Sequence, residues 1–192
     1  MKLESTIIEG IYILHRPLRK DDRGTFTRLF GSDEIAKAGR PMNAIHVNTS
    51  TSLKTGTLRG IHFQYSPFSE AKVVACTSGA IWDVAIDLRL ESPTRFKWFA
   101  THLTPENGKS VILPEGVGHA FLTLEPNSSV VYVTSNVYNE KFLLNLSQVY
   151  EFTNNSNFHI EQGNNEKLSD LLGLVEYNEI DKNKNFQYNY FE

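Results

Sequence analysis

Apolar and polar residues alternate along roughly the first 140 residues, and turn residues interrupt the alternation at short intervals. This pattern is typical of half-buried strands in an all-β sandwich or barrel. It is clearest over residues 80–89, where the even positions are apolar and the odd positions include Asp83 and Asp87. One face of this strand is therefore expected to pack, and the other to line something polar. The apolar face comprises Trp82, Val84, Ile86 and Leu88.

The alternation predicts an all-β fold of the jelly-roll type, because eight or so strands suit that architecture. Segment 72–77 is expected to form a hairpin with 80–89, since Thr77-Ser78-Gly79 makes a three-residue loop that ends in glycine. The other predicted strands are residues 11–14, 25–30, 44–49, 57–64, 96–103, 110–113, 120–124 and 129–138.

The helical content is predicted to be small. Residues 32–38 are expected to form a short surface helix, which Ser32 caps and Gly39 ends. Residues 141–192 are rich in asparagine and weak in apolar periodicity, so we expect a loop-rich, partly helical C-terminal tail with one helix over 165–175. We predict a single domain over residues 1–192, with a core jelly roll at about 5–140.

Composition narrows the possible partners. The chain has 192 residues and a net charge of -3, with a sequence pI near 6.1, which argues against nucleic acid. Cys76 is the only cysteine and lies in an apolar segment, as is typical of a reducing compartment. No apolar stretch approaches the roughly 20 residues of a membrane span, and residues 1–10 lack the apolar part of a secretion signal. We therefore expect a cytoplasmic protein with no membrane partner.

Residues 57–64 place a histidine and an arginine in a strand that is otherwise suited to burial. Strict alternation puts His62 and Gln64 on one face and Arg59 on the other, unless Gly60 carries a bulge that brings Arg59 round. His62 is thus a candidate functional group. The alternative is a core histidine that is satisfied by hydrogen bonds.

His119 follows a sharp turn of Pro114 and two glycines and begins an apolar strand. Inward histidines of a β-barrel can hold a divalent cation, which makes His62 and His119 a candidate pair of ligands. A stable site needs three or four ligands, however, and Gln64 stands where a further imidazole would be needed. The count argues against a metal, and His119 can equally be structural.

Segment 129–138 places two phenols, Tyr132 and Tyr138, on one face of a predicted strand. At about 3.3 Å per residue they would lie roughly 20 Å apart, which suits a long ligand such as a sugar joined through a diphosphate to a base. The alternative is that both are amphipathic barrel residues with hydrated hydroxyls. Lys72 and Arg23, judged alone, are solvated charges. Nucleophilic catalysis is poorly supported, because Cys76 is expected to be buried and no serine lies in a Gly-x-Ser-x-Gly turn.

Several motifs occur in a defined order along the chain. They are Asp22-Arg23-Gly24-x-Phe26, Leu58-Arg59-Gly60-Ile61-His62-Phe63-Gln64, Asp83-Val84-Ala85-Ile86-Asp87-Leu88-Arg89, Ser92-Pro93-Thr94 and Pro114-Glu115-Gly116-Val117-Gly118-His119-Ala120-Phe121, followed by Tyr132 to Tyr138. Together they resemble the dTDP-4-dehydrorhamnose 3,5-epimerase family over about residues 5 to 140. The resemblance implies a cupin-type jelly roll with a ligand cavity, a homodimer that exchanges N-terminal strands, and neither metal nor other cofactor.

The resemblance also implies an activity: epimerisation of a dTDP-4-keto-6-deoxyhexose at C3, at C5 or at both, in a deoxysugar route such as that to rhamnose. By resemblance, His62 is the base, Tyr132 is the acid on the opposite face, and Lys72 stabilises the enolate oxygen. Arginines would hold the diphosphate, and an aromatic residue would stack on the base. The implied substrate-binding residues are Arg23, Phe26, Asn48, Arg59, Gln64, His119 and Tyr138, with Phe26 reaching the partner's site.

The chain also departs from the family's pattern. Arg28 stands where an acidic residue is usual, and His46 where glutamine is common. The late motif whose aspartate orients the base is represented at best by residues 168–172, so Asp170 is a possible orienting acid only with a shifted loop. A histidine base without an acidic partner should have a lowered pKa.

The altered tail makes epimerisation at one carbon nearly as well supported as the double reaction. Other functions remain open from the sequence. They are a keto-sugar isomerase using the same cavity, a non-catalytic nucleotide-sugar binding module, and a metal-dependent cupin oxygenase. The isomerase would not need Tyr132, and the binding module would not exchange substrate protons with solvent.

Overall fold

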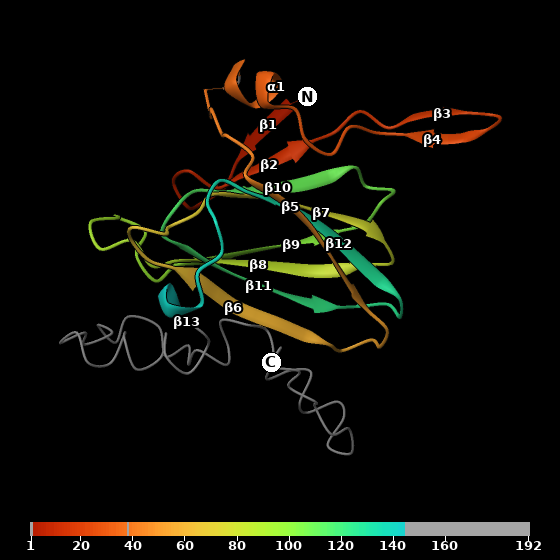
Figure 1. Cartoon of the computed structure of the whole chain (residues 1–192). Coiled ribbons are helices and arrows are strands. Elements are labelled where there is room, and N and C mark those ends of the chain that lie inside the picture. Colours follow the sequence, from red (N-terminus) through yellow and green to blue (C-terminus); the bar gives the residue numbers. More distant parts are fainter. Residues whose placement is uncertain (1, 38, 145–192) are drawn as a thin grey trace.

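The computed structural model describes residues 2–37 and 39–144 of the chain, which form a pair of antiparallel sheets lying face to face (Figure 1). The six-stranded sheet has the order β1 (Lys2–Ser5), β2 (Tyr12–His15), β10 (Lys109–Leu113), β7 (Lys72–Ser78), β12 (Ser128–Thr134) and β5 (His46–Ser52). The five-stranded sheet has the order β13 (Leu143–Leu144), β6 (Leu58–Gln64), β11 (Val117–Thr123), β8 (Ile81–Asp87) and β9 (Trp98–Leu103). The remaining elements are the hairpin β3 (Arg19–Asp21) with β4 (Gly24–Phe26), the helix α1 (Ser32–Lys37) and the 3-10 helix η1 (Glu140–Phe142).

The predicted all-β jelly roll is confirmed. Between β5 and β12 the chain crosses from one sheet to the other at every connection except β8 to β9. Such crossing is how a jelly roll closes two sheets around one interior. The interior therefore receives side chains from both sheets, on alternate positions of each strand.

The predicted hairpin between segments 72–77 and 80–89 is wrong, because β7 and β8 belong to different sheets. The turn at Gly79, which has a positive φ of 66°, carries the chain across the sandwich instead. A Cβ at this position would come within 2.4 Å of Ser128 Oγ, which itself accepts a hydrogen bond from the Ala80 N–H. Close approach to β12, rather than hairpin geometry, thus requires the glycine.

Two predicted strands run four residues past the ends of the observed ones. Segment 25–30 is a strand only to Phe26, and it pairs with β3 in a hairpin that projects from the body (Figure 1). Segment 129–138 ends as a strand at Thr134, because Asn136 donates its side-chain N–H to the carbonyls of Pro67 and Ser69 and leaves the ladder. Tyr138 is therefore not on the same strand as Tyr132.

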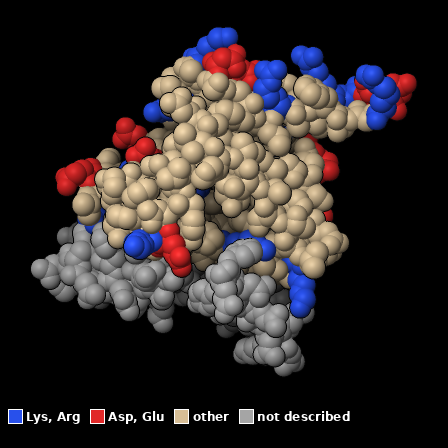
Figure 2. Space-filling model, viewed as in Figure 1, with Lys and Arg blue, Asp and Glu red and all other residues tan. Residues whose placement is uncertain are grey.

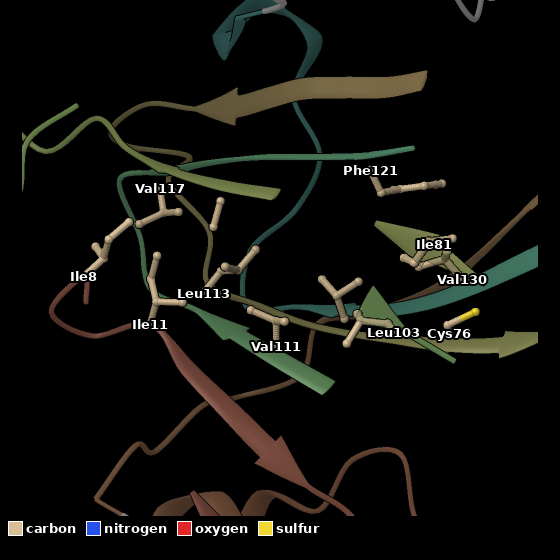
Figure 3. Packing of buried hydrophobic residues seen from close by; sticks show 12 residues of the cluster. Ile8, Ile11, Cys76, Ile81, Leu103, Val111, Leu113, Val117, Phe121 and Val130 are labelled. Atoms are coloured by element: carbon tan, nitrogen blue, oxygen red, sulfur yellow. The ribbon is translucent and has the colours of Figure 1, made fainter. Parts of the chain in front are cut away.

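The main core lies between the sheets (Figure 3). It contains Ile81 and Ala85 of β8, so the face of β8 that carries Asp83 and Asp87 points inward. The opposite, apolar face of β8 packs in a second cluster, as the alternation predicted. The members of the main core are Ile8, Ile11, Val74, Cys76, Ile81, Ala85, Leu103, Val111, Leu113, Val117, Phe121 and Val130.

The predicted surface helix is confirmed as α1, which anchors its fully buried Ile35 on a third apolar cluster over the six-stranded sheet. No helix among the described residues is both long and apolar enough to cross a membrane. The predicted helix over 165–175 and the possible orienting acid Asp170 lie outside the described residues, as does most of the predicted C-terminal tail.

Candidate active site

A β-bulge in β6 brings two of the predicted site residues onto the inner face. In the pairing with β11, His62 lies opposite His119 and Arg59 lies opposite Phe121, so three steps on β6 match two on β11. Gly60 takes up the extra residue with a positive φ of 116°, and a Cβ there would come within 2.6 Å of the His119 carbonyl oxygen. Strict alternation, which puts Arg59 on the opposite face, is therefore wrong here. The alternative, a bulge at Gly60, is what the structure has, and it turns Arg59 to the side of His62.

His62 lies on the inner face of β6 and is partly open to solvent. Protein surrounds the rest of the ring, and this desolvation, reinforced by the positive charges of Lys72, His119 and Arg59, lowers the pKa of His62 to about 4. The ring is therefore neutral near pH 7 and able to accept a proton. No hydrogen-bond partner of this side chain is found within residues 2–37 and 39–144.

His119 is held by a carboxylate that the sequence analysis did not select. Its Nε2 lies 2.7 Å from Asp83 Oδ2, and both side chains are buried. Since an ionised carboxylate only accepts hydrogen bonds, the pair fixes Nε2 as the nitrogen that carries a proton. Asp83 thus sets the orientation and tautomer of a ring that lies directly opposite His62.

Lys72 begins β7 on the six-stranded sheet and is buried. Its Nζ lies 3.0 Å from Glu70 Oε1, and each side chain is only 10% exposed. The strand places Lys72 next to Thr134 of β12, on the same face as Val74 of the core. A cationic ammonium is therefore held inside the sandwich, facing the sheet that carries His62.

Tyr132 lies in the middle of β12, between Val74 of β7 and Asn48 of β5. Burial raises the pKa of its phenol, and the negative charge of Glu70 raises it further, although Arg59 opposes the shift. The phenol consequently keeps its proton and can donate it. Asn48 is half-buried beside it on the same face of the sheet.

Arg59 and Gln64 link the site to neighbouring strands and loops through hydrogen bonds. The Arg59 Nε–H donates to Ser52 Oγ at 2.9 Å, which links β6 to the edge strand of the other sheet. Gln64 is buried, and its amide is committed to the backbone of Phe68, Val137 and Asn139. The bonds to Val137 and Asn139 fix the segment on either side of Tyr138, a residue that is 62% exposed.

The projecting hairpin carries Arg23 and Phe26 away from the cavity of their own chain (Figure 1). All six strand residues of this hairpin are exposed, and among the described residues Arg23 pairs only with Asp21 of the same hairpin, at 2.7 Å. Figure 2 shows charged side chains gathered on this arm. Arg28 and His46, the two departures from the family's pattern, lie near Glu34 of α1 and at the exposed start of β5 respectively.

The structure therefore brings together His62, Arg59, His119, Lys72, Tyr132 and Asn48 between the sheets, and leaves Arg23, Phe26 and Tyr138 outside. Sequence reasoning missed Asp83 and Glu70. The signal for Asp83 was present, since it is the polar position of the clearest alternating strand. Over residues 2–37 and 39–144, no cluster of three or more histidine, cysteine or acidic side chains is arranged to hold a metal ion.

Comparison with known proteins gives one consistent result. The family model described as dTDP-4-dehydrorhamnose 3,5-epimerase matches residues 5–163. The chain is 36% identical over 138 residues to a dTDP-4-dehydrorhamnose 3,5-epimerase of Sinorhizobium fredii, which covers 72% of this chain and 71% of that protein. It is 38% identical over 139 residues to a dTDP-4-dehydrorhamnose 3-epimerase of Streptomyces niveus, covering 72% and 67%.

The fold agrees with this result. The crystal structure of dTDP-4-dehydrorhamnose 3,5-epimerase from Bacillus anthracis, with TDP and PPi bound, superposes with a TM-score of 0.72 at 33% identity. The match covers 75% of this chain and 82% of that one. The similarity thus extends over the two sheets and all the site residues placed between them.

Proposed function

Since the chain belongs to the dTDP-4-dehydrorhamnose 3,5-epimerase family, it is an isomerase that epimerises dTDP-sugars, and we propose that His62, Lys72 and Tyr132 carry its reaction. The proposed substrate is a dTDP-4-keto-6-deoxyhexose. The relatives include enzymes named for both carbons and an enzyme named for C3 alone. The carbon or carbons at which this chain acts must therefore be determined on the chain itself.

The reaction needs a base, an opposed acid and a group that holds negative charge. A ketone at C4 acidifies the C–H bonds at C3 and C5, because the electron pair left by the proton spreads onto the C4 oxygen as an enolate. Inversion follows when one face loses its proton and the opposite face gains one. General acid and base groups typically contribute about 10²–10⁴-fold each to such a step.

One observation carries the proposal: the neutral imidazole and the protonated phenol stand on opposite sheets that face the same interior. His62 lies on β6 of the five-stranded sheet, and Tyr132 lies on β12 of the six-stranded sheet. A sugar ring between the sheets would present one face to each. His62 removes the proton, and Tyr132 delivers one to the carbon from the other side.

Lys72 and His119 supply the electrostatic contribution. The buried Lys72 ammonium is suited to stabilising the enolate oxygen, since a fixed charge in a site with little water is worth far more than one in solution. His119 would contact the ligand through the ring edge opposite Nε2, since Asp83 already holds Nε2 and orients the ring. Binding of an anionic diphosphate beside Arg59 would offset the positive charges that depress the His62 pKa, and so strengthen the base.

The nucleotide end of the substrate would lie toward Asn48, Arg59 and Tyr138, with Gln64 holding the backbone that carries Tyr138. We assign Arg23 and Phe26 to the site of a partner subunit in a homodimer with exchanged N-terminal strands. An isolated two-stranded hairpin is at best marginally stable in water, and this one projects from the body with every strand residue exposed. A second copy would cover it.

The test is incubation with dTDP-4-keto-6-deoxyglucose in heavy water, with deuterium at C3 and C5 followed by NMR. Label at both carbons identifies a 3,5-epimerase, and label at one carbon a single-site enzyme. Absence of label at both carbons would refute the proposal for this substrate. The variant Tyr132→Phe sharpens the result. An epimerase should stop forming epimerised product in this variant, whereas a keto isomerase should keep its activity.

The dimer is tested separately, by mixing two inactive variants. His62→Asn should lack the base, and Arg23→Ala should lack the guanidinium that the arm supplies to the partner's site. If arms are exchanged, mixed dimers contain one intact site, and activity should return toward a quarter of wild type at equal mixing, since half the dimers are mixed and each has one active site. Lack of any recovery, with dimers and subunit exchange confirmed by light scattering and native mass spectrometry, would contradict the exchange.

A further inference from the structure

Glu70 is a buried carboxylate that the proposed chemistry leaves unused. It lies two residues before Lys72, with its Oε1 3.0 Å from the ammonium and its side chain 10% exposed. Removing two charges from water is expensive, and such a pair persists only where its geometry is well held. The pair is thus different in kind from the exposed ion pair of Lys37 with Asp33 on α1.

The backbone on both sides of Glu70 is fastened to the segment that follows β12. The Ala71 N–H donates to Ser135 Oγ at 2.8 Å, and the Ser135 N–H donates to the Ala71 carbonyl at 3.0 Å. On the other side, Asn136 Nδ2 donates to the Ser69 carbonyl at 3.1 Å. Glu70 is therefore fixed relative to the strand that carries Tyr132.

The charges around the pair make the carboxylate necessary. The titratable and charged side chains that face it are Arg59 and His62 of β6, His119 of β11 with its partner Asp83 of β8, and Tyr132 of β12. The Asp83 carboxylate is already paired with His119. Without Glu70, no carboxylate would balance the positive charges of Lys72 and Arg59 that both act on His62, and repulsion would favour withdrawal of the ammonium.

We propose that Glu70 is a positioning residue for the epimerase reaction, because its carboxylate fixes the Lys72 ammonium at the point where negative charge develops on the substrate. This inference rests on the proposed function. An ammonium has three N–H donors, so one can remain on Glu70 while two are directed at the enolate oxygen.

The same carboxylate also acts on the acid of the reaction. Its negative charge adds to the effect of burial in raising the pKa of Tyr132. Glu70 therefore extends the pH range in which the phenol holds the proton that it must donate. Both effects act on the reacting groups and neither on the nucleotide, so the loss of Glu70 should appear in kcat rather than in KM.

The test compares Glu70→Gln with Glu115→Gln in the heavy-water assay. Glu115 is the matched control, since it accepts from Ser69 Oγ of the same loop at 2.8 Å but is solvent-exposed and is not the carboxylate paired with Lys72. For Glu70→Gln we expect kcat to fall about 10- to 100-fold, less than the 10²–10³ typical of losing an oxyanion donor outright, with KM within about threefold. The alkaline limb of its pH–rate profile should move to lower pH. Glu115→Gln should match wild type in all three respects.

A double-mutant cycle separates positioning from folding. If Glu70 acts through Lys72, then Glu70→Gln should change kcat less than about threefold in a Lys72→Met background. Glu70→Asp keeps the charge, and with it the fold, while withdrawing the carboxylate by one methylene, so its kcat should be intermediate. Wild-type kcat in both Glu70 variants, or full additivity in the cycle, would overturn the inference alone. Wild-type protein that takes up no deuterium would overturn the proposed function and this inference together.

Discussion

Two aspartates on the inner face of β8, four residues apart, have opposite surroundings. Asp87 receives hydrogen bonds from Arg89, Ser92 and Thr94 at 2.6–3.1 Å, and its side chain is fully buried. Among the described residues, the Asp83 carboxylate has a single hydrogen-bond partner, the titratable ring of His119. Burial and strand face are the same for both, so the number and kind of donors decides what each carboxylate does.

The different donors give the two aspartates different roles: Asp87 has a scaffold role, which is to stabilise the fold, and Asp83 acts on a residue of the site. Burial by itself would raise the pKa of Asp87, but the hydrogen bonds from Arg89, Ser92 and Thr94 hold it at about 2. Arg89 extends the network to the carbonyl of Glu9, so Asp87 joins β8 to the N-terminal segment. A carboxylate with several fixed donors holds parts of the fold together, whereas one bound to a single imidazole can control the protonation and orientation of that ring.

The largest effect should come from Asp87→Ala, which leaves Arg89 without its ion-pair partner and frees the loop that carries Ser92 and Thr94. We expect the free energy of unfolding to fall by about 3–5 kcal/mol, as for other broken buried pairs, measured by denaturant titration. Glu91→Gln removes an exposed charge from the same loop and should change stability by less than about 0.5 kcal/mol. A loss below about 1 kcal/mol for Asp87→Ala would contradict the scaffold role.

Asp83→Asn should show the opposite profile. An amide in place of the carboxylate no longer dictates which nitrogen of His119 is protonated, so kcat should fall about 100-fold in the heavy-water assay. Binding of dTDP, measured by calorimetry, should stay within about threefold, because the nucleotide does not depend on this ring. If His119→Gln in the Asp83→Asn background lowers kcat by a further large factor, the two residues do not act as a unit.

Acid titration of stability should isolate the contribution of Asp87. The folded-state pKa of Asp87, about 2, lies below the ordinary value of 3.8, so its contribution is present above pH 4 and is lost as pH falls toward 2. Its size is about 2 kcal/mol for a shift of this extent. Denaturant titrations at pH 5 and pH 2.5 should therefore differ less in Asp87→Asn than in wild type, and an unchanged difference would show that Asp87 is not the group responsible.

The smallest effect should come from Ser92→Ala, which removes one donor of several around Asp87. Its hydroxyl lies 2.6 Å from Asp87 Oδ2, yet Arg89 and Thr94 remain in place. We expect a loss of about 1 kcal/mol in unfolding free energy, and no change in kcat. A loss as large as that of Asp87→Ala would mean that the network is cooperative rather than additive.

Alternation of side chains was sufficient to predict the all-β class and most of the strands, because it depends on burial of one or both faces of each strand. It did not reveal that β7 and β8 lie in different sheets, since a glycine turn looks the same whether it reverses a chain within a sheet or carries it across. The residue at which β12 ends could not be predicted from the alternation either. Asn136 stops that strand by bonding to the carbonyls of Pro67 and Ser69, which are far away in sequence.

The candidate site was predictable where a polar residue interrupts an apolar strand, as at His62, His119 and Lys72. Asp83 was visible in the pattern but had no assigned partner, because pairing with His119 needs β11 beside β8. Glu70 precedes its strand and looks like a solvated charge in the sequence. Only the anchoring of its loop at Ser135 and Asn136 brings it into the interior.

The bulge at Gly60 also sets the scale of the site. In a regular strand, residues three apart lie roughly 10 Å from each other and point to opposite faces. The extra residue compresses Arg59 and His62 into two steps of the facing strand, about 7 Å, on one face. An anion-holding group and a proton-accepting group thus become neighbours on one face of a single strand. A ligand whose charged group and reactive carbon are a few bonds apart can engage both residues at once. The one extra glycine therefore sets the length of ligand that this strand selects.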